Sequence, residues 1–285
     1  MNNENKTNIN WYPGHMKKTK DEIKAIMPLV DFVLELVDAR IPLSSKVVDI
    51  DDIVKNRYRI LIMTKKDLCD TQETSKWVKR YEKDNTKVLL VDSNDKNDIK
   101  QIIKAIDELS IKINENRAKK GMRPKTIRGL VIGIPNVGKS TLINRIANRK
   151  VAGVGNIPGF TKNLTWLKCG NVLLLDTPGI LWPKFSSEEV ALNLGAMSAI
   201  KIEVLDEFQL SSHILLKYNN YYKNILNSRY KIDGINEDIL DAYDIIGKNI
   251  GAIKNGEVDY NRVSMYIIND IKNENVRGIT FDRSE

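Results

Sequence analysis

Residues 133–140 read Gly133-Ile134-Pro135-Asn136-Val137-Gly138-Lys139-Ser140. A glycine, four residues and then Gly-Lys-Ser is the pattern of a phosphate-binding loop (P-loop). Glycines let backbone N–H groups turn towards phosphate oxygens, and the following helix directs the positive end of its dipole at the same anion. Average composition gives roughly one chance match in a hundred such chains. The stretch therefore predicts a nucleotide-phosphate site rather than a plain glycine-rich turn.

The flanking sequence gives this loop the required setting. Residues 128–132 have the apolar pattern of a buried strand, and residues 141–147 have that of a helix. In such a loop Lys139 would contact the β- and γ-phosphates, and Ser140 would offer its hydroxyl to Mg2+. We expect the neighbouring nucleotide contacts at Asn136, Val137, Gly138 and Thr141.

Length and composition indicate a globular protein. With 285 residues, 42% of them hydrophobic, the chain suits one large or two ordinary domains. Cys69 and Cys169 show no metal-binding spacing and cannot form a disulfide framework, which suits a reducing compartment. No signal peptide or long apolar run is present, so we expect a cytoplasmic protein without membrane contact.

Charge is unevenly distributed along the chain. Residues 1–183 hold 33 Lys or Arg and 21 Asp or Glu, whereas residues 184–285 hold 12 and 16. A basic part suits contact with nucleic-acid phosphates. Solubility alone is the alternative explanation for a basic chain.

Strand-length apolar runs alternate with helical patterns in the first part of the chain. This alternation predicts an α/β fold, a mostly parallel sheet with helices on both faces, whose ligands bind at the carboxyl ends of the strands. After residue 183 only helical patterns follow, which predicts a small all-α domain at 184–285. The preceding α/β domain would span residues 1–183, and its first 28 residues would form an N-terminal segment. The expected strands are residues 32–37, 59–63, 87–91, 130–134 and 172–175, and the expected later helices are 188–200, 203–230, 237–250 and 260–272.

Two other stretches leave alternatives open. Residues 114–125 are polar and basic, and we interpret them as a loop that is either a solvated linker or an RNA contact. Tyrosines at 218, 221, 222 and 230 suit packing better than a base-stacking platform.

A second phosphate motif, Asp176-Thr177-Pro178-Gly179, follows the last expected strand. Asp176 would hold Mg2+ through water, and the Gly179 N–H would meet the γ-phosphate, so the segment would sense whether that phosphate is present. Thr161 lies between the two phosphate motifs and could close over Mg2+ with its hydroxyl. An ordinary loop threonine is the alternative there.

The string Thr64-Lys65-Lys66-Asp67 follows the second expected strand and could select the base. The Asp67 carboxylate can accept the N1 and N2 hydrogens of guanine but would repel the acceptor edge of adenine. Lys65 would pack its stem along the base, while Thr64 replaces the usual Asn, so one base hydrogen bond is lost or replaced. A surface Lys-Lys-Asp turn is the alternative. Ser93 and Asn94 follow the third expected strand and are further candidates for nucleotide contact.

The order of these motifs, base-reading string first and P-loop later, is reversed from that of ordinary GTPases. Together with Trp11-Tyr12-Pro13-Gly14-His15 and Asp38-Ala39-Arg40, it resembles the circularly permuted GTPases of the YlqF/YawG family. The resemblance implies hydrolysis of GTP to GDP and phosphate, and a role late in assembly of the large (50S) ribosomal subunit. It also implies ribosomal RNA contact by the helical tail. We expect a monomer.

Permutation places the γ-phosphate motif only residues 180–183 away from the helical domain. We therefore expect a nucleotide-controlled docking switch. The alternative is a GTP-gated checkpoint or scaffold in which hydrolysis is incidental. A P-loop small-molecule kinase is a weaker reading, because no acceptor-binding lid is evident and Asp67 favours guanine.

The group that activates water is not the usual glutamine, because Ile180 occupies its position. His15 lies in a turn-forming segment, and the resemblance implies a role for this histidine in hydrolysis; the alternative is that the segment only anchors the amino end or binds RNA. His213, in an apolar helical context, is expected to be structural. In GTPases that use K+, an Asn at the position of Asn136 helps to coordinate the ion, so K+ is a possible second cofactor beside Mg2+.

Overall fold

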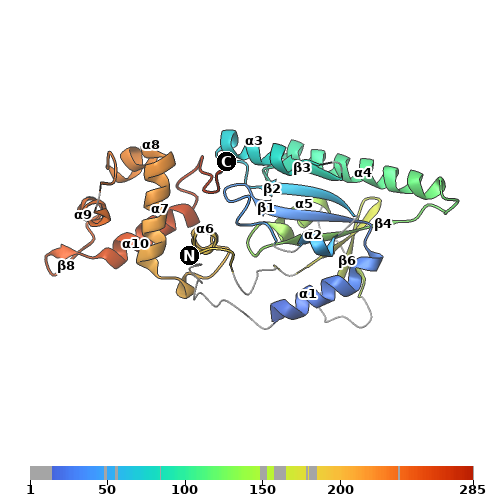
Figure 1. Cartoon of the computed structure of the whole chain (residues 1–285), viewed down its shortest axis with the longest axis horizontal. Helices are drawn as coiled ribbons and strands as arrows, with labels where there is room; N and C mark the ends of the chain where they lie inside the picture. The colour runs from blue at the N-terminus through green and yellow to red at the C-terminus, as the bar shows by residue number, and fades with distance from the viewer. Residues whose placement is uncertain are drawn as a thin grey trace, which may run out of the picture.

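The computed structural model describes residues 15–47, 50–54, 57–83, 85–147, 153–156, 165–177, 179, 185–236 and 238–284. An α/β part formed by the first part of the chain lies beside a mostly helical part formed by residues 185–284 (Figure 1). None of the helices within these ranges is long and apolar enough to cross a membrane.

The α/β part is built on a sheet that has seven strands among the described residues, in the order β3-β2-β1-β4-β7-β6-β5. The first five in that order are mutually parallel, as predicted, and β6 and β5 extend the sheet in antiparallel pairing. The parallel strands are β3 (Thr86–Leu90), β2 (Tyr58–Thr64), β1 (Phe32–Asp38), β4 (Ile127–Gly133) and β7 (Val172–Asp176). The other two are β6 (Thr165–Cys169) and β5 (Gly153–Asn156).

Alternation of side chains along the strands gives the sheet two apolar faces. Leu61 and Met63 of β2 pack in a cluster with Trp77 of α3. Ile60 and Ile62, one residue out of phase, belong to the larger core with Ile102 of α4. Helices therefore cover both faces, as predicted. The helices of this part are α1 (His15–Ile26), the 3-10 turn η1 (Met27–Leu29), α2 (Ile50–Ile53), α3 (Thr71–Tyr81), α4 (Lys96–Ala118) and α5 (Lys139–Ile146).

Helix α4 is longer than the sequence pattern indicated. Residues 114–118, which we expected in a loop, form its last turn. The Asn114 side chain pairs with both backbone groups of Lys125 at 3.1 and 3.2 Å. This contact fixes the return of the chain towards β4. The exposed basic residues Lys119, Lys120 and Arg123 lie in the turn itself.

The second part is mainly helical, as predicted, with one short antiparallel ribbon that the sequence pattern did not indicate. Its helices are α6 (Glu188–Ala196), η2 (Ile202–Val204), α7 (Glu207–Tyr221), α8 (Lys223–Ile225), the π-helical turn η3 (Leu226–Tyr230), α9 (Ile239–Asn249) and α10 (Tyr260–Lys272). The ribbon consists of β8 (Ile253–Lys254) and β9 (Glu257–Val258). Tyr218, Tyr222 and Tyr230 are buried, which confirms packing as their role, while Tyr221 is exposed.

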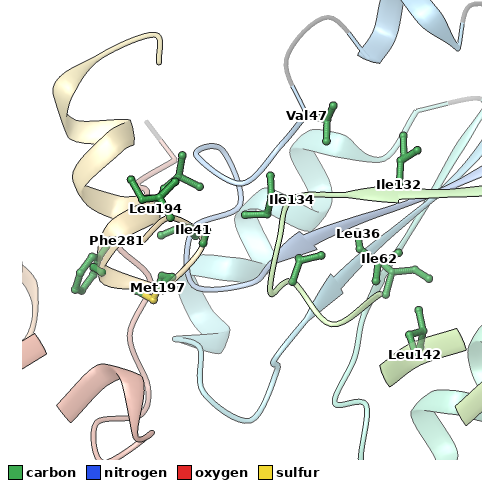
Figure 2. Packing of buried hydrophobic residues seen from close by; sticks show 14 of the residues in the cluster. Leu36, Ile41, Val47, Ile62, Ile132, Ile134, Leu142, Leu194, Met197 and Phe281 are labelled. Atoms are coloured by element: carbon green, nitrogen blue, oxygen red, sulfur yellow. The ribbon is translucent and has the colours of Figure 1, made fainter. Parts of the chain in front are cut away.

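The two parts share one apolar core rather than lying apart on a linker. Ile41 and Ile134 of the α/β part lie near Leu194, Met197 and Phe281 of the helical part (Figure 2). The predicted boundary near residue 183 lies outside the described residues and stays a prediction.

The last residues of the chain return to the α/β part. We call residues 276–284 the C-terminal strap. Its Phe281 N–H donates to the Arg40 carbonyl at 2.7 Å, and the Asp282 carboxylate accepts from the N–H groups of Leu43 and Ser44, each at 2.7 Å. The Ser44 hydroxyl also donates to Asp282 at 2.6 Å. The strap thus ties the helical part to the loop that follows β1.

Candidate functional site

The topology brings the predicted motifs to one edge of the sheet. Strand register pairs Asp38 with Thr64, Leu36 with Gly133 and Val131 with Asp176. All these strands are parallel, so their carboxyl ends lie together, where ligands bind in folds of this kind.

The P-loop has the backbone that a phosphate cradle requires. Gly138 has a φ of 100° immediately before α5, a conformation that side chains with a Cβ disfavour. Ser140 and Thr141 lie in the first turn of α5 and are exposed, whereas Val137 is buried and anchors the loop. The first turn of α5 is therefore open to solvent at Ser140 and Thr141, while the buried Val137 holds the loop from beneath.

Lys139 folds back over the loop that precedes it. Its ammonium donates to the carbonyls of Gly133 at 3.0 Å and Ile134 at 2.8 Å. Burial lowers the pKa of Lys139 to about 8, and the nearby Asp176 carboxylate opposes that shift. A buried ammonium with few anionic neighbours favours the arrival of a phosphate.

Asp176 has a carboxylate oxygen that is free to bind an ion. One carboxylate oxygen, Oδ1, is buried and has no hydrogen-bond partner among the described residues. Burial raises the pKa of Asp176, and Lys139 opposes this. Because native structures rarely leave a buried carboxylate oxygen unpaired, this oxygen, with the exposed Ser140 hydroxyl, fits the oxygen donors that Mg2+ prefers.

Gly179 lies directly against the P-loop. A Cβ at this position would stand 2.7 Å from the nitrogen and 2.8 Å from the Cα of Pro135, closer than side-chain carbons approach other atoms. Only glycine fits here without displacement, so the two phosphate motifs are in backbone contact.

Asn136 contacts the helical part. Its backbone has a φ of 58°, and its side-chain amide donates to the Ser198 carbonyl at 2.7 Å. Ser198 follows α6. The residue predicted as a K+ ligand thus connects the P-loop with the helical part.

Thr64 is placed differently from a base ligand. It is buried, and its hydroxyl lies 2.7 Å from the Val137 carbonyl and 3.1 Å from that of Val37. Both are acceptors, so the hydroxyl proton is used within the protein. Thr64 therefore ties β2 to the P-loop.

Lys65 and Asp67 form the exposed side of the same turn. Lys65 has a φ of 62°, and its ammonium pairs with Asp38 at 2.8 Å. Asp67 keeps a side chain that is 32% exposed, as a base-reading carboxylate requires. Burial, together with the neighbouring Asp92 and Glu274 carboxylates, raises the pKa of Asp67, and Arg277 opposes this.

Asp38 and Arg40, which the sequence analysis used only for the family resemblance, form a buried pair beside the site. The Arg40 guanidinium holds Asp38 through two hydrogen bonds at 3.0 and 2.8 Å. Although burial favours the neutral acid, Arg40 and Lys65 hold the pKa of Asp38 well below its usual range. This buried pair supports the turn that carries Asp67.

Ser93 and Asn94 lie in the turn after β3, beside this site. The Lys66 N–H donates to the Val91 carbonyl, which joins this turn to the base-reading string. Asn94 accepts from Arg145 of α5 at 3.1 Å. The turn therefore lies between the base-reading string and the helix that follows the P-loop.

Three predicted features fall outside what the structure describes. His15 begins α1, but its side chain is not among the described side chains, and Thr161 and Ile180 lie outside the described residues. His213 contacts Asn193 at 2.8 Å, and burial lowers the pKa of His213 to about 4, as suits the structural role expected of it.

Comparison with known proteins agrees with this geometry. A family described as 50S ribosome-binding GTPase matches residues 128–237. Ribosome biogenesis GTPase A of Bacillus licheniformis is 41% identical over 97% of this chain and 99% of its own length. The protein of that name from Priestia megaterium is 40% identical over 96% of both chains.

The chain belongs to the ribosome biogenesis GTPase A family. As a member of this family it is a GTPase that works in ribosome assembly. The solved structure of GNP-bound YlqF from T. maritima shares the fold, with a TM-score of 0.65 and 24% identity over 93% of this chain and 98% of that one. The resemblance inferred from motif order is thereby confirmed. GTPases of this kind use Mg2+.

Proposed function

We propose that this GTPase binds GTP at the carboxyl edge of its sheet and acts as a nucleotide-controlled docking switch on the large ribosomal subunit late in its assembly. The P-loop and Lys139 hold the phosphates, Asp67 reads guanine, and Gly179 senses the γ-phosphate. Lys65, Ser93 and Asn94 border the base, while Thr64 supports the site from beneath.

Mg2+ would be held by Ser140 and Asp176, with Thr161 as a further ligand from the loop between them. The unpaired Asp176 Oδ1 supports this assignment. Bound there, Mg2+ would neutralise charge that develops on the phosphate oxygens.

The observation that carries the switch is the hydrogen bond from Asn136 to the Ser198 carbonyl. It is a direct contact between the P-loop and the helical part. If the loop moves when it closes on phosphates, this hydrogen bond moves with it or breaks. Nucleotide state would then reach the helical part through the P-loop as well as through residues 180–183.

Charge in the helical part argues against a simple electrostatic clamp on RNA. Lys217 is buried and pairs with Glu189, and Arg229 pairs with Asp270 at 2.6 Å. Lys223, Arg229 and Lys231 are exposed, but Arg229 is neutralised by its partner Asp270. The basic α/β part, including the exposed Lys119, Lys120 and Arg123, is better suited to supply the charge for ribosomal RNA.

His15 is proposed to orient the attacking water in place of glutamine. Its His15→Ala variant should lose turnover stimulated by large subunits while keeping GTP affinity near that of the wild type. Unchanged stimulated turnover would contradict this role.

Two hydrolysis measurements test the proposed function. Single-turnover GTP hydrolysis should be faster with purified large ribosomal subunits than without them, and faster in KCl than in NaCl. Rates that do not respond to large subunits would favour a checkpoint in which hydrolysis is incidental. Equal rates in the two salts would remove K+ from the site.

A further inference from the structure

The base-reading turn, residues 64–68, is held from both ends. At its start Lys65 pairs with Asp38 at 2.8 Å. At its end the Leu68 carbonyl accepts two N–H groups from the C-terminal strap, those of Gly278 at 2.8 Å and Ile279 at 3.2 Å. Asp67 lies between these two anchors, so its position depends on the last residues of the chain.

The strap continues along the segment that follows this turn. The Thr280 hydroxyl accepts from the Asp70 N–H at 3.2 Å and lies 2.9 Å from the Thr74 hydroxyl. Thr280 and Thr74 are fully buried. These contacts fix the strap against the start of α3, immediately after the base-reading turn.

Charged groups of the helical part surround the base-reading carboxylate. The Arg277 guanidinium stands 3.9 Å from Asp67 Oδ2, and Glu274 is close enough to act on the charge of both Asp67 and Arg40. At 3.9 Å, Arg277 is a counterion that does not hydrogen-bond, so the acceptor positions of Asp67 remain open to a base. Asp92 adds a second carboxylate on the side of the α/β part.

We propose that the C-terminal strap completes the guanine site, with Arg277 as the positioning residue that holds the Asp67 carboxylate ready for the base. This rests on the proposed reading of guanine by Asp67. Arg277 offsets the repulsion of Asp92 and Glu274, while the strap N–H groups fix the end of the turn.

The test is the affinity of the full-length chain for GDP in three variants. Arg277→Gln should weaken GDP binding roughly two- to fivefold, the range for a half-exposed ion pair, and Arg277→Lys should restore most of the loss. The control is Arg262→Gln on α10, whose guanidinium contacts the Gly251 carbonyl within the helical part. The control should bind GDP as the wild type does.

A second experiment, in the Asp67→Asn variant, distinguishes loss of carboxylate positioning by Arg277 from a general loosening of the strap. In Asp67→Asn the amide can donate to the C2 carbonyl of xanthine, so that variant should bind XDP. Adding Arg277→Gln to it should leave XDP affinity unchanged, because no carboxylate remains to position. Equal loss of XDP and GDP affinity, or no loss of GDP affinity in Arg277→Gln, would overturn the proposal.

The pH profile gives an independent readout. Without Arg277, Asp67 loses one of the positive charges that offset Asp92 and Glu274, with Arg40 still nearby, so its protonation should begin at higher pH and the acid limb of GDP affinity should move upward. An unmoved acid limb would contradict the proposal. A wild type that does not prefer GDP to ADP would instead contradict base reading by Asp67 itself.

Discussion

Buried polar side chains mark the working residues of this site, and each has a different reason to be buried. The Thr64 hydroxyl hydrogen-bonds to the P-loop backbone, and the Lys139 ammonium donates to backbone carbonyls. Asp176 has one carboxylate oxygen without a hydrogen-bond partner among the described residues. Burial of such groups costs free energy unless they are paired. We therefore expect the first to be structural and propose that the other two bind ligands.

Thr64→Val should lower the free energy of unfolding by roughly 1–2 kcal/mol, because the Val137 and Val37 carbonyls lose a buried donor. GDP and ADP affinities should change by the same factor, since the hydroxyl does not face the base. Urea unfolding and nucleotide titration measure both quantities. Thr64→Ser, which keeps the hydroxyl, is the matched control, and a selective loss of guanine affinity would show that Thr64 contacts the base.

Lys139 should make nucleotide-free stability depend on pH. Its pKa is lowered to about 8 in the folded chain, so the charged form is disfavoured there and the free energy of unfolding should rise as pH increases from about 8 towards 10. The gain should be roughly 1–2 kcal/mol between pH 7.5 and 9.5. The measured quantity is the difference between wild type and Lys139→Met, in which other titrating groups cancel. A difference that is flat with pH would contradict the lowered pKa of the buried Lys139.

Gly179→Ala should weaken the binding of GTP more than the binding of GDP. The added Cβ would collide with Pro135, so the N–H that meets the γ-phosphate must move. We expect weaker binding of a GTP analogue with GDP affinity little changed, measured by titration calorimetry. Gly234→Ala, where the nearest atom to the new Cβ is 3.6 Å away, is the control. Equal loss for both nucleotides would mean that the clash disrupts the whole loop.

Single residues were predictable from sequence where a motif fixes both the residue type and its spacing. The P-loop, Asp176 and Gly179 lie together at one edge of the sheet, as expected, because strand, loop and helix follow one another along the chain. The partners of Asn136 and Asp67 come from residues 198 and 277, and no local pattern could relate them.

At the scale of elements, the pattern of strand-length apolar runs separated by helical periodicity was a sufficient guide to the parallel strands and to most helices. It missed β5 and β6 because Gly153–Asn156 and Thr165–Cys169 are short and lack a regular apolar repeat. It also missed the C-terminal strap, which has no regular structure and is held by side-chain and backbone hydrogen bonds.

Substitution of Asp282 tests whether the strap holds the two parts together. Asp282→Ala removes the acceptor for two backbone N–H groups, the Ser44 hydroxyl and the Asn193 amide. We expect a loss of roughly 2–4 kcal/mol and broader thermal unfolding, because several buried donors are left unpaired. Calorimetry measures both effects. Asp233→Ala, at an exposed position within the helical part, is the control, and an unchanged transition in Asp282→Ala would contradict the anchoring role.

At the scale of the whole molecule, the helical part contacts the nucleotide site at two places, the base-reading turn and the P-loop. The strap reaches the base-reading turn, and Ser198 reaches the P-loop. The shared apolar core at Ile41, Met197 and Phe281 makes the two parts a packed unit (Figure 2). A change of nucleotide therefore has two direct routes into the helical part.

The most direct test of this account is sedimentation of the full chain with purified large ribosomal subunits. The affinity should be at least about fivefold higher with a non-hydrolysable GTP analogue than with GDP, the lower range of coupling between two sites. Equal affinity in the two nucleotide states would contradict a nucleotide-controlled docking switch.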